Sequence, residues 1–413
     1  YSLHTFFVAL LFALLHVWDR DRSFPKLALF ALAAGLSFGN HLQTVMMAPA
    51  IFFFVLSGDK RPLLQVRTLL PLAFLFLLPL IAYAYLPVRT LAGAAIHWGD
   101  PDSFHRFFDH VTAVSHREGY AFGLTPQAFL GRLGGALELI WSQFGLLLLV
   151  CGWGAWTEGR TRWGMFFGLV ILFDLCYTVF LNTVSLQATP FMLPGSLASA
   201  VLLGLGLGDL LKRIDGSPRV REAMRRCVAV ACALIPVILL ATRIGSCDQS
   251  RNYIAYEHAL KMFRTCPGGS TLVMEGDNHL FPAAYGRIVG GMGKNITLYD
   301  RHNIVFKMPY LGEDMKTFHG SWPDLREILE RQIIRKRAQS GLYFAMFNPA
   351  DIPLPDGYRL IPAGLLYRVV KEGAPVRAGV DPWPWYASES IFEPFERDYM
   401  TRQLTANFLL HRG

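Results

Sequence analysis

The residues best suited to chemistry crowd into one polar stretch, AIHWGDPDSFHRFFDH, which covers residues 95–110 of an otherwise apolar region. His105 and Asp109 lie four residues apart, so on a helix they would share one face and offer two metal ligands. A tetrahedral zinc site needs two further ligands on a fixed scaffold. We therefore favour a polar helix face over a metal site, and we expect no bound metal.

The spacing of apolar residues in the second half of this stretch predicts an amphipathic helix. Asp100 followed by Pro101 is typical of a helix N-cap and a first helical position. The apolar residues then follow at i, i+3, i+4 and i+7, namely Phe104, Phe107, Phe108 and Val111. This pattern predicts a helix lying on a membrane surface. The candidate chemistry narrows to His97, Trp98 and Asp100, where Trp98 is either a membrane-boundary residue or a platform for a sugar.

The composition indicates a membrane protein that also carries a soluble part. Hydrophobic residues make up 53% of the 413 residues and charged residues only 17%, with a mean hydropathy of +0.32. Soluble proteins carry about 25% charged residues. The chain begins at Tyr1 inside an apolar segment, which predicts a fragment whose beginning is missing. We expect the lipid bilayer as a partner and no nucleic acid.

Eight apolar segments are candidate membrane spans in an α-helical polytopic protein. They cover residues 2–18, 27–39, 41–57, 68–86, 136–156, 164–181, 195–211 and 227–244. Lys and Arg gather in every second connection, whereas the connections GNH and NTVSLQATP carry none. By the positive-inside rule, Tyr1, the loop 87–135 with its interfacial helix, and the region after Arg243 lie on the outer side. We expect a multi-pass protein whose outer side is the periplasm, for a bacterial inner membrane, or a lumen in a eukaryote.

The region after residue 244 reads as a soluble domain. The runs STLVME and NITLYD, with a helix around Pro282 to Val289 between them, predict a βαβ unit, and GLYFAMF and GLLYRVV predict two more strands. We therefore divide the chain into a membrane region (1–244), an extracytoplasmic α/β domain (245–375) and a linker that leads into a helical, repeat-like region (376–413). The sequence leaves open whether Cys247 and Cys266 pair.

Four polar residues within or beside the spans are candidate site residues. Arg89 ends the fourth span, where it either contacts a phosphate in bidentate fashion or extends towards lipid headgroups. Asn40 and His41 occupy the break between the second and third spans, and polar groups at such breaks tend to line a cavity. Asp174 lies near the centre of the sixth span, where a carboxylate is costly and is either functional or paired.

Asp277 and Asn278 are secondary candidates in the soluble domain. They follow the predicted strand STLVME in a tight GDN turn, and α/β sheets bind ligands beyond the carboxyl ends of their strands. An N-cap of the following helix is an equally good interpretation of either residue.

Four motifs occur in a characteristic order: YSLHTFFVALLFALL, GLSFGNHLQTVMMAP, YLPVRT followed by IHWGDPDSFHRFFDHV, and STLVMEGDNHLFPAAY. Together they resemble bacterial membrane proteins of a domain-of-unknown-function family related to animal transmembrane protein 260, a protein O-mannosyltransferase. The resemblance covers most of residues 1–300 and implies the GT-C glycosyltransferase superfamily. GDNHLF departs from the family pattern, because His279 stands where a further acid is expected.

The resemblance implies an enzyme that moves a sugar, for instance mannose, from a polyprenyl-phosphate donor to an extracytoplasmic acceptor. The expected acceptors are Ser and Thr hydroxyls of envelope proteins. The catalytic carboxylate would lie in the first outer loop, upstream of Tyr1. The lipid-linked sugar is a substrate, so no cofactor is expected.

The same resemblance implies roles for the remaining candidates. Arg89 would bind the lipid-linked phosphate, and Asn40 and His41 would line the same pocket. Trp98 and Asp100, with His97 beside them, would shape the sugar or acceptor side. Two other functions are alternatives: a membrane anchor that presents the α/β domain, and a lipid or solute transporter, although the sequence lacks the internal repeats typical of transporters.

Overall fold

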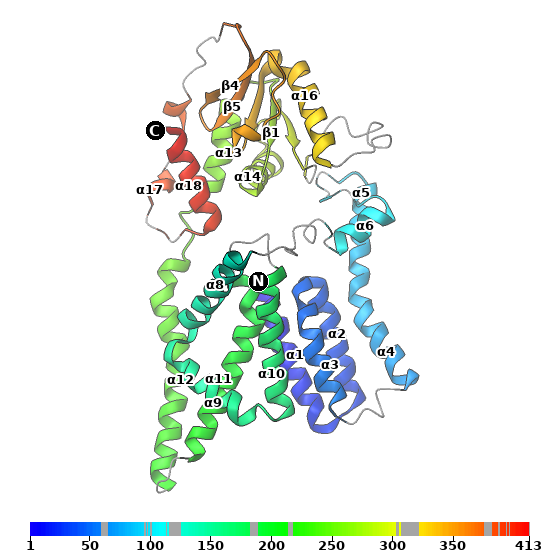
Figure 1. Cartoon of the computed structure of the whole chain (residues 1–413), viewed down its shortest axis with the longest axis vertical. Coiled ribbons are helices and arrows are strands. Elements are labelled where there is room, and N and C mark those ends of the chain that lie inside the picture. Colours follow the sequence, from blue (N-terminus) through cyan, green and yellow to red (C-terminus); the bar gives the residue numbers. More distant parts are fainter. Residues whose placement is uncertain are drawn as a thin grey trace. The chain divides into compact units, whose positions relative to one another are not determined.

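The computed structural model divides into two compact units. The first comprises Tyr1–Ala92 with Pro101–Cys232, and the second comprises Gly93–Asp100 with Ala233–Gly413 (Figure 1). The structure describes residues 1–58, 65–94, 96, 98–99, 101–112, 114, 125–181, 189–213, 218–302, 305–306, 322–375, 382–386, 389–393, 395 and 397–412. His97 and Asp100, two of the predicted site residues, lie outside the described residues.

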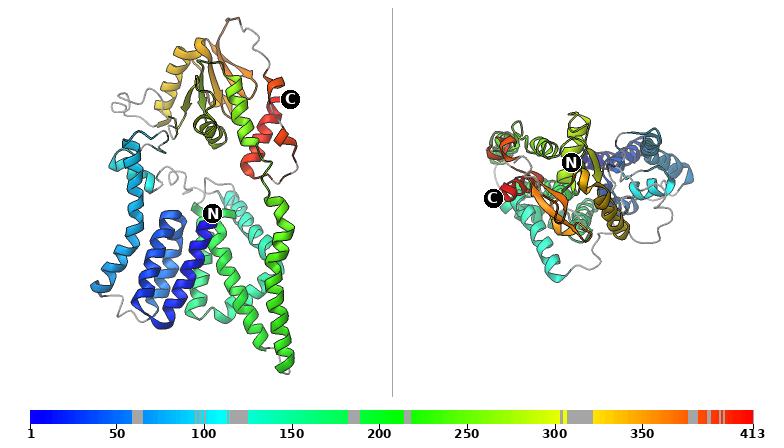
Figure 2. Two further views of the ribbon diagram at one scale, coloured as in Figure 1. Left: turned by 180° about the vertical axis from the view of Figure 1, so that it is seen from behind. Right: turned by 90° about the horizontal axis from the view of Figure 1, so that it is seen from above.

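The first unit is built from helices that run side by side (Figure 2). In order they are α1 (Ser2–Asp21), α2 (Phe24–Asn40), η1 (Leu42–Met47), α3 (Ala48–Leu56), α4 (Val66–Leu77), η2 (Leu78–Ala84), α5 (Tyr85–Leu91), α6 (Phe104–Val111), α8 (Pro126–Phe144), η3 (Gly145–Leu147), α9 (Leu148–Glu158), α10 (Arg162–Cys176), η4 (Tyr177–Leu181), η5 (Thr189–Met192), α11 (Leu193–Arg213) and α12 (Pro218–Cys247), of which α12 continues into the second unit.

All eight segments predicted as spans are helical, and among the described residues six helical stretches are long and apolar enough to cross a membrane. They are Ser2–Asp21, Val66–Leu91, Pro126–Glu158, Arg162–Leu181, Leu193–Arg213 and Glu222–Thr242. The second and third predicted spans form shorter helices, α2 with 17 residues and the segment Leu42–Leu56. Several apolar helices of this kind indicate a membrane protein.

Two features hold the helices of the first unit together. Buried side chains from α1, α3, α10 and α11 form a common apolar core, which includes Leu15, Phe54, Phe166 and Ala198. At the crossing of α9 and α11 the backbones touch: a Cβ atom on Gly154 would lie 2.1 Å from the carbonyl oxygen of Leu202. Glycine is therefore required at residue 154, as small residues are at close crossings of membrane helices.

The second unit is an α/β domain with a mixed five-stranded sheet in the order β2-β1-β3-β5-β4. Strands β1, β2 and β3 are parallel, and β5 and β4 are antiparallel to their neighbours. The elements are α13 (Ile254–Thr265), β1 (Thr271–Met274), α14 (Asp277–Ile288), β2 (Thr297–Asp300), α16 (Trp322–Gly341), β3 (Leu342–Ala345), η6 (Pro349–Asp351), β4 (Tyr358–Ala363), β5 (Leu366–Lys371), η7 (Trp383–Trp385), α17 (Glu389–Phe392) and α18 (Tyr399–Arg412).

The βαβ prediction is confirmed, since α14 joins the parallel pair β1 and β2. Two apolar cores lie on this sheet, one lined by α13 and α14 and the other by α16. Strand β4 escaped prediction because it forms an edge of the sheet and contains Pro362, a residue that central strands exclude. Cys247 is exposed, Cys266 is buried, and both are free thiols.

Two predicted helix starts are wrong. The N-cap of α14 is Gly276, whose φ of +80° suits glycine, so Asp277 is the first helical residue and neither it nor Asn278 is the cap. The N-cap of α6 is Ser103, whose hydroxyl accepts a hydrogen bond from the Arg106 N–H, and not Asp100. The amphipathic character of α6 holds, because Phe104 and Phe108 are exposed and their rings stack.

Candidate functional site

The break after α2 forms a polar site at one end of the helices of the first unit. His41 adopts an extended backbone between α2 and η1, and its Nδ1 accepts a hydrogen bond from the Gln43 N–H at 3.3 Å. A neutral His41 therefore carries its proton on Nε2, which makes that atom a hydrogen-bond donor. The break thus offers the Nε2–H of the half-buried His41 as a hydrogen-bond donor.

His4 of α1 packs directly against this imidazole. The two rings stack with centroids 4.6 Å apart and planes inclined by 30°. The His4 side chain is fully buried, and neither ring nitrogen has a hydrogen-bond partner among the described residues. Tyr1, the N-cap of α1, also contacts this imidazole, with its ring centroid 5.6 Å from that of His41. Sequence reasoning missed His4, although a histidine inside an apolar span is itself a signal.

Hydrogen bonds of Gln43 and Asp174 connect the break to α10 and α11. The Gln43 Nε2 donates to Asp174 Oδ1 at 2.7 Å and to the carbonyl oxygen of Phe191 at 2.5 Å. The Gly195 N–H donates to Asp174 Oδ2 at 2.7 Å. Asp174 therefore joins η1, α10 and the start of α11, and of the two roles predicted for this carboxylate the structure displays the paired one. Gln43 was not among the predicted residues.

Arg132 is a cation near this end of the helices that the sequence did not single out. It lies on α8, is half-buried, and donates from Nη1 to the carbonyl oxygen of Val179 in η4 at 3.2 Å. Helix α8 also packs against η5, the element that carries Phe191. No carboxylate pairs with Arg132 within the described part of the chain, so its remaining donors are available to an anion.

Arg89 and Asn40 are less closely tied to the break. Arg89 lies exposed in the last turn of α5, and no hydrogen bond or ion pair joins it to any described residue. Asn40 is the exposed last residue of α2. Helix α2 does contact the stretch Val66–Leu91 that carries Arg89, because the hydroxyl of Tyr83 in η2 donates to the carbonyl oxygen of Gly39 in α2 at 3.3 Å. The roles of Arg89 and Asn40 therefore stay predictions.

In the second unit the predicted residues gather around the start of α14. Trp98 stacks on Phe281 of this helix, with ring centroids 5.2 Å apart, and remains 44% exposed. Asp277 is exposed in the first turn, where a carboxylate is favoured by the helix dipole. Asn278 is buried and its amide donates to Gln403 of α18. Helix α14 thus carries a carboxylate in its first turn and has the ring of Trp98 stacked on its Phe281.

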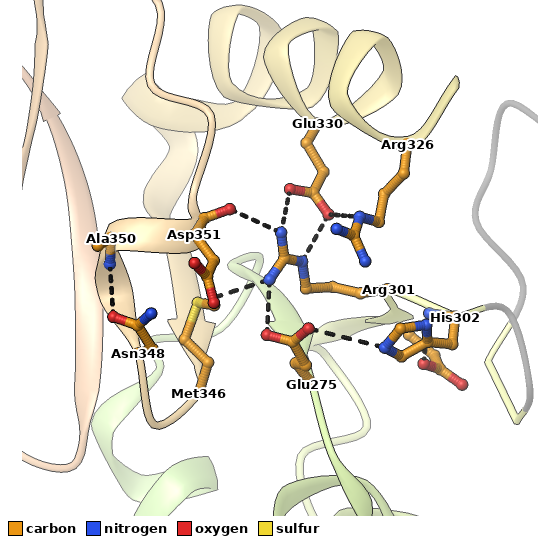
Figure 3. A network of polar contacts seen from close by, with 10 residues as sticks. Glu275, Arg301, His302, Arg326, Glu330, Met346, Asn348, Ala350 and Asp351 are labelled. Atoms are coloured by element: carbon orange, nitrogen blue, oxygen red, sulfur yellow. Dashed lines mark hydrogen bonds and ion pairs between the residues drawn. The ribbon is translucent and has the colours of Figure 1, made fainter. Parts of the chain in front are cut away.

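A network of charges occupies the carboxyl ends of β1 and β2 (Figure 3). The buried Arg301 guanidinium bonds both oxygens of Glu330 at 2.6 and 2.9 Å, and Glu275 at 2.6 Å. A hydrogen bond from His302 and the neighbouring Arg301 charge lower the pKa of Glu275 to about 2. The positive charge of Arg301 is thus balanced by Glu330 and Glu275 of the same unit, so Arg301 is not available to bind an external anion. No group of three potential metal ligands occurs among the residues that the structure describes.

Two buried histidines, His258 of α13 and His279 of α14, join these two helices. His258 Nε2 and His279 Nδ1 are 2.9 Å apart, and the His279 ring also packs on Phe347 after β3. Burial lowers the pKa of His258 well below its usual value and that of His279 to about 4. The pair is therefore neutral at neutral pH. His279, the departure from the family pattern, serves packing and hydrogen bonding inside this domain.

The histidine pair predicts an acid-sensitive second unit. Because the pKa of His279 is about 4 in the folded state and 6.5 when unfolded, the unfolded state binds more protons between these values. The free energy of unfolding should fall as the pH drops from 6.5 to 4, by about 3 kcal/mol from His279. Hydrogen exchange of β1 amides in the full chain, measured from pH 7.5 to 4.5, would report this loss. His279→Gln should flatten the dependence, whereas His105→Gln, at an exposed histidine, should leave it unchanged; equal slopes for both variants would contradict the prediction.

Comparison with known proteins gives a match in the first unit, over the segment that contains the helix break. Residues 1–63 match the family model described as the protein O-mannosyl-transferase TMEM260 N-terminal domain. No curated protein matches the chain, and no solved structure does. The matched segment contains α1, α2, η1 and α3, and with them His4, His41 and Gln43. The match suggests an O-mannosyltransferase-like function and hence a glycosyltransferase.

Proposed function

We propose that the chain is part of a GT-C-type membrane glycosyltransferase. It moves a sugar, mannose in the first instance, from a polyprenyl-phosphate donor to a hydroxyl of an extracytoplasmic protein. The observation that carries this proposal is the stacked pair of His4 and His41, which lies at a helix break inside the segment that matches the O-mannosyltransferase family. A bacterial inner membrane with the α/β domain on the periplasmic side fits the distribution of Lys and Arg.

The reaction defines what this site has to do. The bond between the sugar C1 and the phosphate oxygen breaks, and a bond from C1 to the acceptor oxygen forms. The acceptor loses its hydroxyl proton to a base, and the polyprenyl phosphate leaves with the electron pair. Negative charge therefore builds up on the phosphate, and fixed donors and cations aimed at it accelerate the step.

We assign the leaving phosphate to donors around the helix break. His41 offers its Nε2–H because Nδ1 is already bonded to the Gln43 N–H. Arg132 offers a guanidinium that is oriented by the Val179 carbonyl, and Arg89 adds a second cation from α5. Asn40, beside His41, is assigned to the same pocket. The two arginines supply positive charge and the neutral His41 supplies an N–H donor, so the proposal requires no metal ion. No residue of this chain is proposed as the general base.

In the second unit taken by itself, exposed groups around the start of α14 are suited to bind a sugar or a protein acceptor. Trp98 offers an aromatic face, and Asp277 offers a carboxylate on the helix against which Trp98 stacks. Asp100 and His97 stay assigned to sugar or acceptor binding on the strength of the family resemblance.

The proposal is tested by exchanging Arg132 in the full-length protein. Arg132→Ala, reconstituted in liposomes with polyprenyl-phosphate mannose and envelope proteins, should lower the transfer rate by about 100-fold or more. Arg132→Lys should recover part of the rate, because a charge without the planar fork remains. Arg160→Ala removes an exposed arginine just after α9 and serves as the control.

Two outcomes would contradict the proposal. Unchanged transfer in Arg132→Ala, together with an unchanged melting temperature, would exclude Arg132 from the site. Absence of transfer by the wild type would favour an anchor or a transporter.

A further inference from the structure

A cavity of about 330 Å³ lies in the second unit between the end of α16 and β5. Ala338 and Gln339 line it from α16, and Arg368, Val370 and Lys371 line it from β5. In the register of the sheet, Val369 pairs with Leu342, the first residue of β3. The cavity is therefore at the edge of the sheet opposite to the carboxyl ends of the parallel strands. Its volume is at the lower end of the range for small-molecule sites.

The described lining of this cavity is cationic. It holds Arg368, Lys371 and the Gln339 amide, and none of the residues known to line it is an acid. Arg368 is half-buried, and its Nε is buried without a hydrogen-bond partner. Within the described ranges no carboxylate pairs with Arg368 or Lys371. A buried donor without an acceptor is unfavourable, so an anion that enters the cavity and accepts hydrogen bonds from Arg368 would stabilise the domain.

The number of donors favours a phosphate over a carboxylate. A guanidinium, an ammonium group and an amide present more N–H donors than the two oxygens of a carboxylate can accept. A phosphate accepts them on three oxygens, and an arginine contacts it in bidentate fashion. The cavity is also larger than a phosphate ion, and the side chains of Ala338, Val370 and Pro375 offer apolar contacts for an organic group.

We propose that this cavity binds a small phosphate monoester, with the phosphate on Arg368 and Lys371 and the organic part against Ala338 and Val370. The site is independent of the helix break and of the glycosyltransferase reaction proposed above. Its position on the soluble unit makes it a binding site for a ligand from the aqueous phase.

Titration of the full chain in detergent with phenyl phosphate tests this proposal. Isothermal titration calorimetry should show saturable binding to the wild type, weaker binding of inorganic phosphate, and no binding of benzyl alcohol. Arg368→Gln and Lys371→Gln should each lower the affinity for phenyl phosphate by about tenfold or more. Arg359→Gln, at an exposed arginine on the neighbouring strand β4, should leave the affinity unchanged.

The variants also separate a binding role from a structural one. Arg368→Gln should retain the melting temperature of the wild type, because no side-chain hydrogen bond or ion pair of Arg368 is lost among the described residues. Lys371→Gln, at an exposed residue, tests the site if Arg368→Gln fails to fold. Equal affinities of the wild type and both variants would overturn the proposal, as would the absence of saturable binding. Binding of phosphatidate in mixed micelles but not of phenyl phosphate would assign the cavity to a lipid headgroup and overturn the aqueous source.

Discussion

Replacing Arg301 by methionine is expected to lower the free energy of unfolding of the second unit by about 3–5 kcal/mol. The guanidinium holds both oxygens of Glu330, whose side chain is fully buried, and its removal leaves that carboxylate with Arg326 as its nearest cation at 4.0 Å. Burial already raises the pKa of Glu330. The cost arises from the uncompensated carboxylate and not from lost packing, since methionine retains much of the side-chain volume.

A second substitution separates these two causes. The double variant Arg301→Met with Glu330→Leu removes both charges, so it should be more stable than Arg301→Met alone. Hydrogen exchange of the β1 and β2 amides in the full chain measures both variants. Arg331→Met is the matched control: it breaks an exposed ion pair with Glu327 on the same helix and should cost at most about 1 kcal/mol. A double variant that is as unstable as the single one would show that packing, and not the buried charge, decides the result.

Introducing a methyl group at Gly154 is expected to destabilise the first unit by about 3 kcal/mol, the upper end of the usual cost of overpacking. The new Cβ would lie 2.1 Å from the Leu202 carbonyl oxygen and 2.8 Å from the Gly206 nitrogen. Both are backbone atoms, so no side chain can turn away, and α9 and α11 must separate.

Gly152→Ala provides the control on the same helix. A Cβ at residue 152 meets no atom within 4 Å, and alanine favours helix over glycine by about 1 kcal/mol, so this variant should be as stable as the wild type or slightly more stable. Thermal melting in detergent compares the two. If Gly154→Ala melts at the temperature of Gly152→Ala, the close crossing of α9 and α11 is absent in the protein.

Local patterns predicted most of the secondary structure. Hydropathy located the six helical stretches of the described structure that are long enough to cross a membrane, because such a span must be apolar along its whole length. Short β-type apolar runs located β1, β2, β3 and β5. Helix boundaries were less accurate: the cap position of α14 depends on a φ of +80° at Gly276, and the sequence did not reveal which residue of the turn adopts it.

The site itself was only partly predictable. His41 and Asp174 were recognisable as polar residues in apolar surroundings, but the residue that links them, Gln43, is 131 positions from Asp174. Such a bond depends on the packing of three helices, which no local pattern encodes. Arg132 was overlooked for a similar reason, because its environment is set by the Val179 carbonyl of another helix.

The helix break is held in unequal ways on its two sides. Towards α10 and α11, three hydrogen bonds converge on the Gln43 amide and the Asp174 carboxylate, and directional bonds of this kind resist a screw motion or slippage along the helix axis. Towards the first turn of α1, the His41 side chain is held by ring contacts with Tyr1 and His4, which are less directional than hydrogen bonds. The break is therefore fixed more firmly towards α10 and α11 than towards the start of α1, and a displacement of the His41 ring would meet less resistance on the α1 side.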